Sequence, residues 1–169
     1  MAKHVTQVGV PELDYEFHTI TVDTSGQSAN TFTVHLQQPL KNVVQAKLLA
    51  AHIHANVQVE HCYVSIDELN TNFNDRAFKD LSDASEASKA NVRGAFASIV
   101  SESSTHGVGS QLFLFRDNYP CAVQYINPIR SIDRLTCSLY DQDGNTIKDP
   151  DTASDNYLVI RFTCMKQNI

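Results

Sequence analysis

The stretch from residue 132 to residue 144 reads Ile132-Asp133-Arg134-Leu135-Thr136-Cys137-Ser138-Leu139-Tyr140-Asp141-Gln142-Asp143-Gly144. Apolar and polar side chains alternate through its centre, where Leu135, Cys137 and Leu139 form the apolar row. This period of two is typical of a strand that buries one face in a core and leaves the other in water. Asp143-Gly144 then suits a tight turn at the end of the strand. The stretch therefore predicts a half-buried strand followed by a turn.

The same alternation recurs along the chain and is its dominant pattern. Further apolar rows are Phe32, Val34 and Leu36; Leu49, Ala51, Ile53, Ala55, Val57 and Val59; Cys62, Val64 and Ile66; and Leu158, Ile160, Phe162 and Cys164. Less regular strands are expected at 13–22, 94–100, 111–115 and 121–126. The first of these changes phase between Phe17 and Ile20, which suggests a bulge. Turn residues separate the others at 107–109 and 117–120. We expect Leu36, Ile66, Leu139, Ile160 and Phe162 to be largely buried.

Eight or nine strands without a βαβ rhythm leave a sandwich or a barrel as the architecture. The strand number and one long polar insertion favour a single jelly-roll β-sandwich of eight antiparallel strands. An immunoglobulin-like sandwich fits less well, because the chain contains no Trp. The insertion is compatible with a short helix around residues 74–89, since Ala77, Phe78, Leu81 and Ala84 follow helical spacing. Residues 1–12 are expected to form an N-terminal arm and residues 13–169 the jelly-roll domain.

The composition of the 169 residues is that of one globular domain, with 42% hydrophobic and 19% charged residues. A net charge of -6 disfavours general binding to nucleic acid, because phosphates are repelled. No apolar run approaches the ~20 residues of a transmembrane helix, and residues 1–4 lead into a polar segment without a signal-peptide core. The four cysteines, Cys62, Cys121, Cys137 and Cys164, include no CxxC pair. They are expected to be reduced thiols of a cytosolic product.

Three histidines form the candidate metal group that the sequence offers. His52 and His54 lie two residues apart and so share one face of a strand, and His61 with Glu60 follows on the next strand. The group loosely resembles the cupin metal motif, but it lacks the glycines that frame that motif and its second half. The alternation also places His52 and His54 on the polar face. We therefore predict surface histidines and no metal site.

The remaining candidates are also read as structural. The segment from Asp141 to Asn145 resembles part of a calcium loop, but its Gly occupies the fourth position instead of the sixth, which favours a tight turn. Asp67 and Glu68 end a strand and are expected to be solvated. No nucleophile elbow, phosphate-binding loop or dinucleotide fingerprint occurs. The sequence thus predicts no catalytic residue and no cofactor.

Three stretches resemble the small single jelly-roll capsid proteins of nucleo-cytoplasmic large DNA viruses and related viruses. They are residues 32–40 with Lys41-Asn42-Val43, residues 62–69, and residues 132–144, which resemble the penultimate strand and its turn in those proteins. These patterns are of strands and turns, and they cover about a fifth of the chain.

The resemblance implies a structural role without active-site residues. In such viruses a single jelly-roll protein forms a pentamer at each five-fold vertex, called the penton, and a double jelly-roll protein forms the surrounding capsomers. The resemblance therefore implies a homopentamer within the virion capsid, made in the host cytoplasm. Its expected partners are itself, the major capsid protein capsomers and minor capsid proteins, without nucleic acid or membrane insertion. The alternatives left open are a minor single jelly-roll capsid protein, a cupin-like metal-binding protein and a ligand-binding jelly-roll module.

Overall fold

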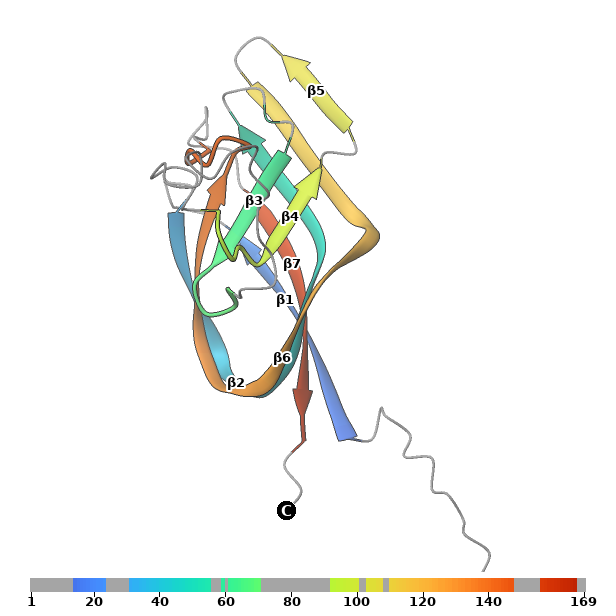
Figure 1. The fold of residues 1–169 in the computed structure, drawn as a ribbon, viewed down its shortest axis with the longest axis vertical. Coiled ribbons are helices and arrows are strands. Elements are labelled where there is room, and N and C mark those ends of the chain that lie inside the picture. The colour runs from blue at the N-terminus through green and yellow to red at the C-terminus, as the bar shows by residue number, and fades with distance from the viewer. Residues whose placement is uncertain are drawn as a thin grey trace, which may run out of the picture.

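The computed structural model describes residues 14–23, 31–55, 59, 61–70, 92–100, 103–107, 110–147 and 156–166. Every named element within these ranges is a β-strand, and every pairing between strands is antiparallel. The strands are β1 (Tyr15–Asp23), β2 (Thr31–Ala55), β3 (His61–Ile66), β4 (Ala97–Val100), β5 (Ser103–Gly107), β6 (Ser110–Tyr140) and β7 (Tyr157–Met165). The prediction of an all-β, antiparallel fold is therefore confirmed (Figure 1).

The strands form one curved sheet in the order β1-β7-β2-β6-β3-β4, with β5 paired to β6. The two long strands, β2 and β6, each take part in two different groups of neighbours. Residues 43–52 of β2 pair with β7 on one side and with the first half of β6 on the other. Residues 31–35 of β2 pair with the second half of β6, which also pairs with β3. We call β1, β7, the second half of β2 and the first half of β6 the first strand group. The second strand group consists of the first half of β2, the second half of β6, β3 and β4.

Both long strands bend sharply at the same end of the domain (Figure 1). The pairing register between β2 and β6 shifts between His35 and Leu40 and again between Val43 and Gln45. Asn42, in the β2 bend, has a positive φ of 52°, which Asn tolerates better than most residues. The bends let the two strand groups face each other across one hydrophobic core.

The core contains buried side chains from both strand groups. Ile66, Leu139, Ile160 and Phe162 are completely buried, as predicted, whereas Leu36 is only half-buried and packs at the margin of the core. In the second half of β2 the inward row includes Leu48 and then Ala51 and Ile53. A register shift between Leu48 and Ala50 causes this change of phase. The predicted inward position of Leu49 is therefore wrong, and Leu49 is half-buried.

The strand count differs from the prediction because expected strands merge. The expected turn at 117–120 is instead an irregularity inside β6, opposite the shift between Leu48 and Ala50. β6 pairs with β2 before and after this irregularity, so β6 continues through it as one strand. The polar strand β5, which the sequence reading missed, pairs with the start of β6 through Gly107 and Ser110. The described ranges thus contain seven strands, where the sequence predicted eight.

Two local predictions are corrected by the pairing and the burial. β1 and β7 pair residue for residue from Tyr15 to Asp23, so no bulge separates Phe17 from Ile20. Phe17 points outward instead, where the guanidinium of Arg161 lies 5.9 Å from its ring centre. The face of β3 that was expected to be exposed to solvent is also buried, because Val92 and Ala95 cover Tyr63. The expected arm at 1–12 and the helix around 74–89 lie outside the described residues.

Candidate functional site

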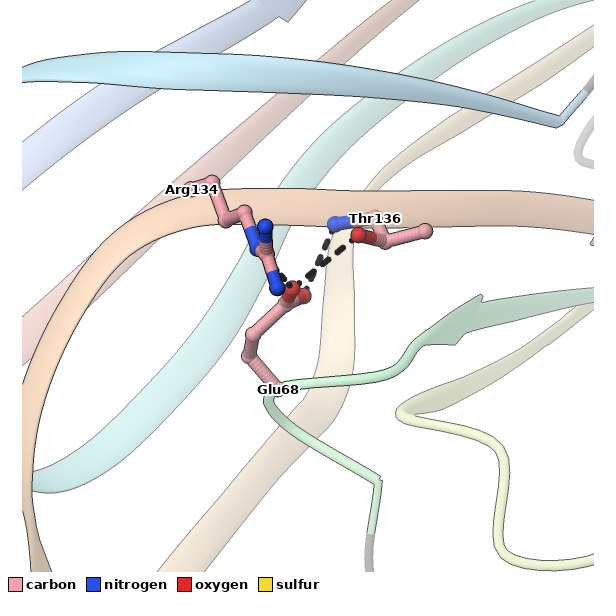
Figure 2. Close-up of polar contacts among 3 residues, drawn as sticks. All are labelled: Glu68, Arg134 and Thr136. Atoms are coloured by element: carbon pink, nitrogen blue, oxygen red, sulfur yellow. Dashed lines mark hydrogen bonds and ion pairs between the residues drawn. The ribbon is translucent and has the colours of Figure 1, made fainter.

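A carboxylate contact joins the end of β3 to β6. One oxygen of Glu68 accepts a hydrogen bond from the backbone amide of Thr136 at 2.7 Å, and the other accepts one from the Thr136 hydroxyl at 3.0 Å (Figure 2). The Nε of Arg134 lies 3.8 Å from the same carboxylate, although the Arg134 side chain is 61% exposed. The expectation that Glu68 is merely solvated is therefore wrong. Asp67, beside it, is exposed as expected.

The residues from Asp67 to Asn70, here called the β3 turn, contact both halves of β6. The hydroxyl of Tyr125, at the β6 bend, donates a hydrogen bond to the carbonyl oxygen of Leu69 at 2.9 Å. Burial raises the pKa of Tyr125, so this hydroxyl keeps its proton. Asn70 closes the turn by accepting a hydrogen bond from the backbone amide of Ile66 at 3.1 Å. Together with the Glu68 contact, these bonds fix the turn to β6 on both sides of its bend.

Cys62, Cys137 and Cys164 are free thiols and buried, which confirms the prediction for these three. Burial raises the pKa of Cys137 to about 12, and the nearby charges of Glu68 and Asp67 raise it further. Burial also raises the pKa of Cys62 and of Cys164. Since the thiolate is the reactive form, these cysteines act as small core side chains. The side chain of Cys121 lies outside those described.

The structure brings two of the three candidate histidines together. His52 and His54 lie on the outer face of β2 with their ring centres 4.9 Å apart, and Tyr157 of β7 stacks on His52 at 6.0 Å. Both histidines are half-buried. Burial lowers the pKa of His52, and the charge of His54 lowers it further. A pair of ligands on one open face is too few for a protein zinc site, which takes three or four.

His61 is separately engaged, although the prediction grouped it with the other two. Its Nε2 lies 2.6 Å from the Ser98 hydroxyl of β4, and its ring stacks on Tyr63 at 4.5 Å. Within the described ranges no three His, Cys, Asp or Glu side chains are arranged to hold a metal ion. Glu60 is not among the described residues.

The calcium-like segment forms a tight turn, as predicted. The Oδ1 of Asp141 accepts hydrogen bonds from the backbone amides of Asp143 and Asn145, both at 2.9 Å. Gly144 has a φ of 79°, the left-handed conformation for which glycine is suited. Through these two bonds the buried Asp141 caps its own loop.

An open cleft of about 970 Å³ lies between β1 and the bend of β2. One wall carries Glu16, His18 and Ile20 of β1, and the other carries the segment from His35 to Asn42. Glu16 and His18 form an ion pair at 3.5 Å when the histidine is protonated. No sequence pattern predicted this cleft, because its walls come from segments that meet only in the fold.

Comparison with known protein families finds no model that matches the chain, and comparison with curated proteins finds no significant match. The described part of the chain has no helix of the length and hydropathy needed to cross a membrane.

Proposed function

We propose that the domain is a single jelly roll. Counting β2 and β6 as two strands each, divided at their bends, makes eight strands besides β5. The first strand group then has the order β1, β7, β2, β6, and the second has the order β2, β6, β3, β4. Two four-stranded groups linked by strands that pass from one to the other are what a double Greek key produces. This division of β2 and β6 is the observation that carries the proposal.

We further propose that the protein is a structural capsid subunit that forms a ring of five at the vertices of an icosahedral virus. The resemblance of residues 32–43, 62–69 and 132–144 to vertex capsid proteins supports this role. The fold is compatible with it, because Glu68 and Asp141 are both used to fix turns and the buried thiols are unreactive. A shell subunit needs a rigid body with two complementary sides, since a five-fold ring is built from head-to-tail contacts.

The native mass of the purified protein tests this proposal. Like charges on neighbouring copies oppose association, because each chain carries a net charge of -6. The Debye length falls from about 10 Å at 0.1 M salt to about 3 Å at 1 M, so added salt weakens this repulsion. Sedimentation at rising salt and protein concentration should therefore shift from the 18.8 kDa monomer to a species of five chains. A stable dimer, trimer or hexamer would contradict the ring of five.

The second candidate role is that of a minor capsid protein with the same fold, and it has to be distinguished from the vertex role. Such a protein would lie beneath the capsomers and need not form a ring. Its position in the particle separates the two roles.

A further inference from the structure

β1 is an edge strand of the described part of the sheet. Among the described residues β1 pairs only with β7, so its other edge has no strand beside it. Natural edge strands are commonly blunted by proline, lysine or a bulge. β1 has the sequence YEFHTITVD and an unbroken register of nine residues, without proline, lysine or a bulge, and Glu16 is its charged side chain that faces the cleft. Its edge is therefore suited to pairing with another strand.

A second free edge lies across the cleft from β1. Within the described ranges, the first half of β2 pairs on one side only, with the second half of β6. The cleft of about 970 Å³ runs between these two edges and has Ile20, Leu36 and Leu40 among its lining residues. Ile20 and Leu36 remain half-buried although they pack against the main core. A strand laid in this cleft would gain main-chain hydrogen bonds from β1 and would cover these apolar side chains.

The surroundings of the cleft extend the same surface. The start of β1 and the end of β7 project past the bends of β2 and β6 (Figure 1). Met165, the last residue of β7, lines the cleft and is 42% exposed.

We propose that this cleft binds residues 5–10 of a neighbouring copy in the ring, an inference that rests on the proposed assembly. The segment reads Val5-Thr6-Gln7-Val8-Gly9-Val10 and lies outside the described ranges. Its β-branched residues favour an extended strand, and Thr6, Val8 and Val10 would share one face. That face would cover the half-buried Ile20 and Leu36, while the backbone pairs with β1.

The position of the segment favours exchange between copies over folding back on its own β1. The backbone amide of Lys166 donates to the Asp14 carbonyl oxygen at 2.9 Å, so the β1–β7 ladder continues to Asp14. Only Pro11, Glu12 and Leu13 then remain to reverse the chain. A three-residue hairpin loop usually ends in a residue with the left-handed conformation, which is costly for Leu13 because it is neither Gly nor Asn. Thirteen extended residues span roughly 40 Å, whereas a domain of this size has a radius of gyration of about 15 Å.

Cross-linking of the full chain tests the exchange. The variant Val8→Cys/Gln37→Cys places one thiol in the segment and one on an exposed residue of the cleft wall. A short bis-maleimide at high salt should give a ladder of linked chains in denaturing gels. The control Val8→Cys/Asp143→Cys, with its second thiol on the exposed turn, and the unmodified chain should lose that ladder.

The outcomes of this experiment test the exchange of residues 5–10 separately from the proposal that five chains form the ring. A ladder ending at five chains supports both exchange and the ring. A ladder ending at another number supports exchange and contradicts the ring of five. A cross-link confined to single chains shows that the segment folds back on its own domain, which overturns exchange. A native mass of five chains without any cross-link at Gln37 also overturns exchange and leaves the ring intact.

Discussion

The carboxylate of Glu68 accepts two hydrogen bonds from Thr136, one from its backbone amide at 2.7 Å and one from its hydroxyl at 3.0 Å. The two residues are 68 positions apart in the sequence. Their contact fixes the β3 turn to the second half of β6. The Tyr125 hydroxyl bonds the same turn to the β6 bend. The turn therefore stabilises the bend that brings the two strand groups together.

Replacing Glu68 with alanine should lower the free energy of unfolding by about 2 kcal/mol, because hydrogen bonds to a charged group contribute about 1.5–3 kcal/mol each and this carboxylate is partly exposed. The matched control Arg134→Ala should cost less than about 1 kcal/mol, since its ion pair is solvent-exposed. Chemical denaturation of both variants measures these differences. Equal effects of the two substitutions would show that the Thr136 contact is not the stabilising one.

Stability should fall as the pH drops from 7 towards 5, partly through His52. Its folded-state pKa is lowered by burial and by His54. Below the unfolded pKa of about 6.5, the unfolded chain therefore takes up a proton more readily than the folded one. His52→Gln should make the loss of stability over this range smaller, whereas His35→Gln, at an exposed position, controls for removing a histidine. Denaturation midpoints at several pH values supply the test. An unchanged pH slope in His52→Gln would rule out this contribution.

The thiols should react only when the chain unfolds. Cys62, Cys137 and Cys164 are buried, and their raised pKa values keep them protonated at neutral pH. Reaction with a thiol reagent under denaturing, non-reducing conditions should count four groups per chain, Cys121 included. The native protein should react at most at Cys121. A denatured count of two would reveal a disulfide.

Removing residues 74–89 and bridging the ends with a short Gly/Ser linker should leave the domain folded. The described residues on both flanks of the insertion reach into the buried part of the domain. Leu69 is buried in the β3 turn on one side, and Val92 and Phe96 are buried on the other. A cooperative unfolding transition close to that of the intact chain is the expected result. Failure of the shortened chain to fold would place part of the segment in the core.

The sequence predicted the fold class and most inward rows, because each depends only on neighbours along one strand. Leu139, Ile160 and Phe162 illustrate this success. The wrong predictions concern residues whose position depends on pairing with another segment of the chain. Phe17 points outward without a bulge because the β1–β7 register is continuous. Turn residues at 117–120 did not end a strand, because the ladder to β2 resumes beyond them.

The candidate sites were harder to predict for the same reason. Glu68 carries no local signal of its role, because its partner Thr136 belongs to another strand. The cleft has walls from β1 and from β2, and no single stretch of sequence contains both. By contrast, the turn at Asp141 was predictable, because its bonds are made to amides two and four residues away.

The position of the chain in purified virus particles tests the central claim most directly. A reconstruction by electron cryo-microscopy, refined without imposing the vertex model, would locate the domain by its curved sheet and by the bends of β2 and β6. The proposed function predicts five copies around each five-fold axis. Density only beneath the capsomers, or absence of the chain from the particles, would contradict it.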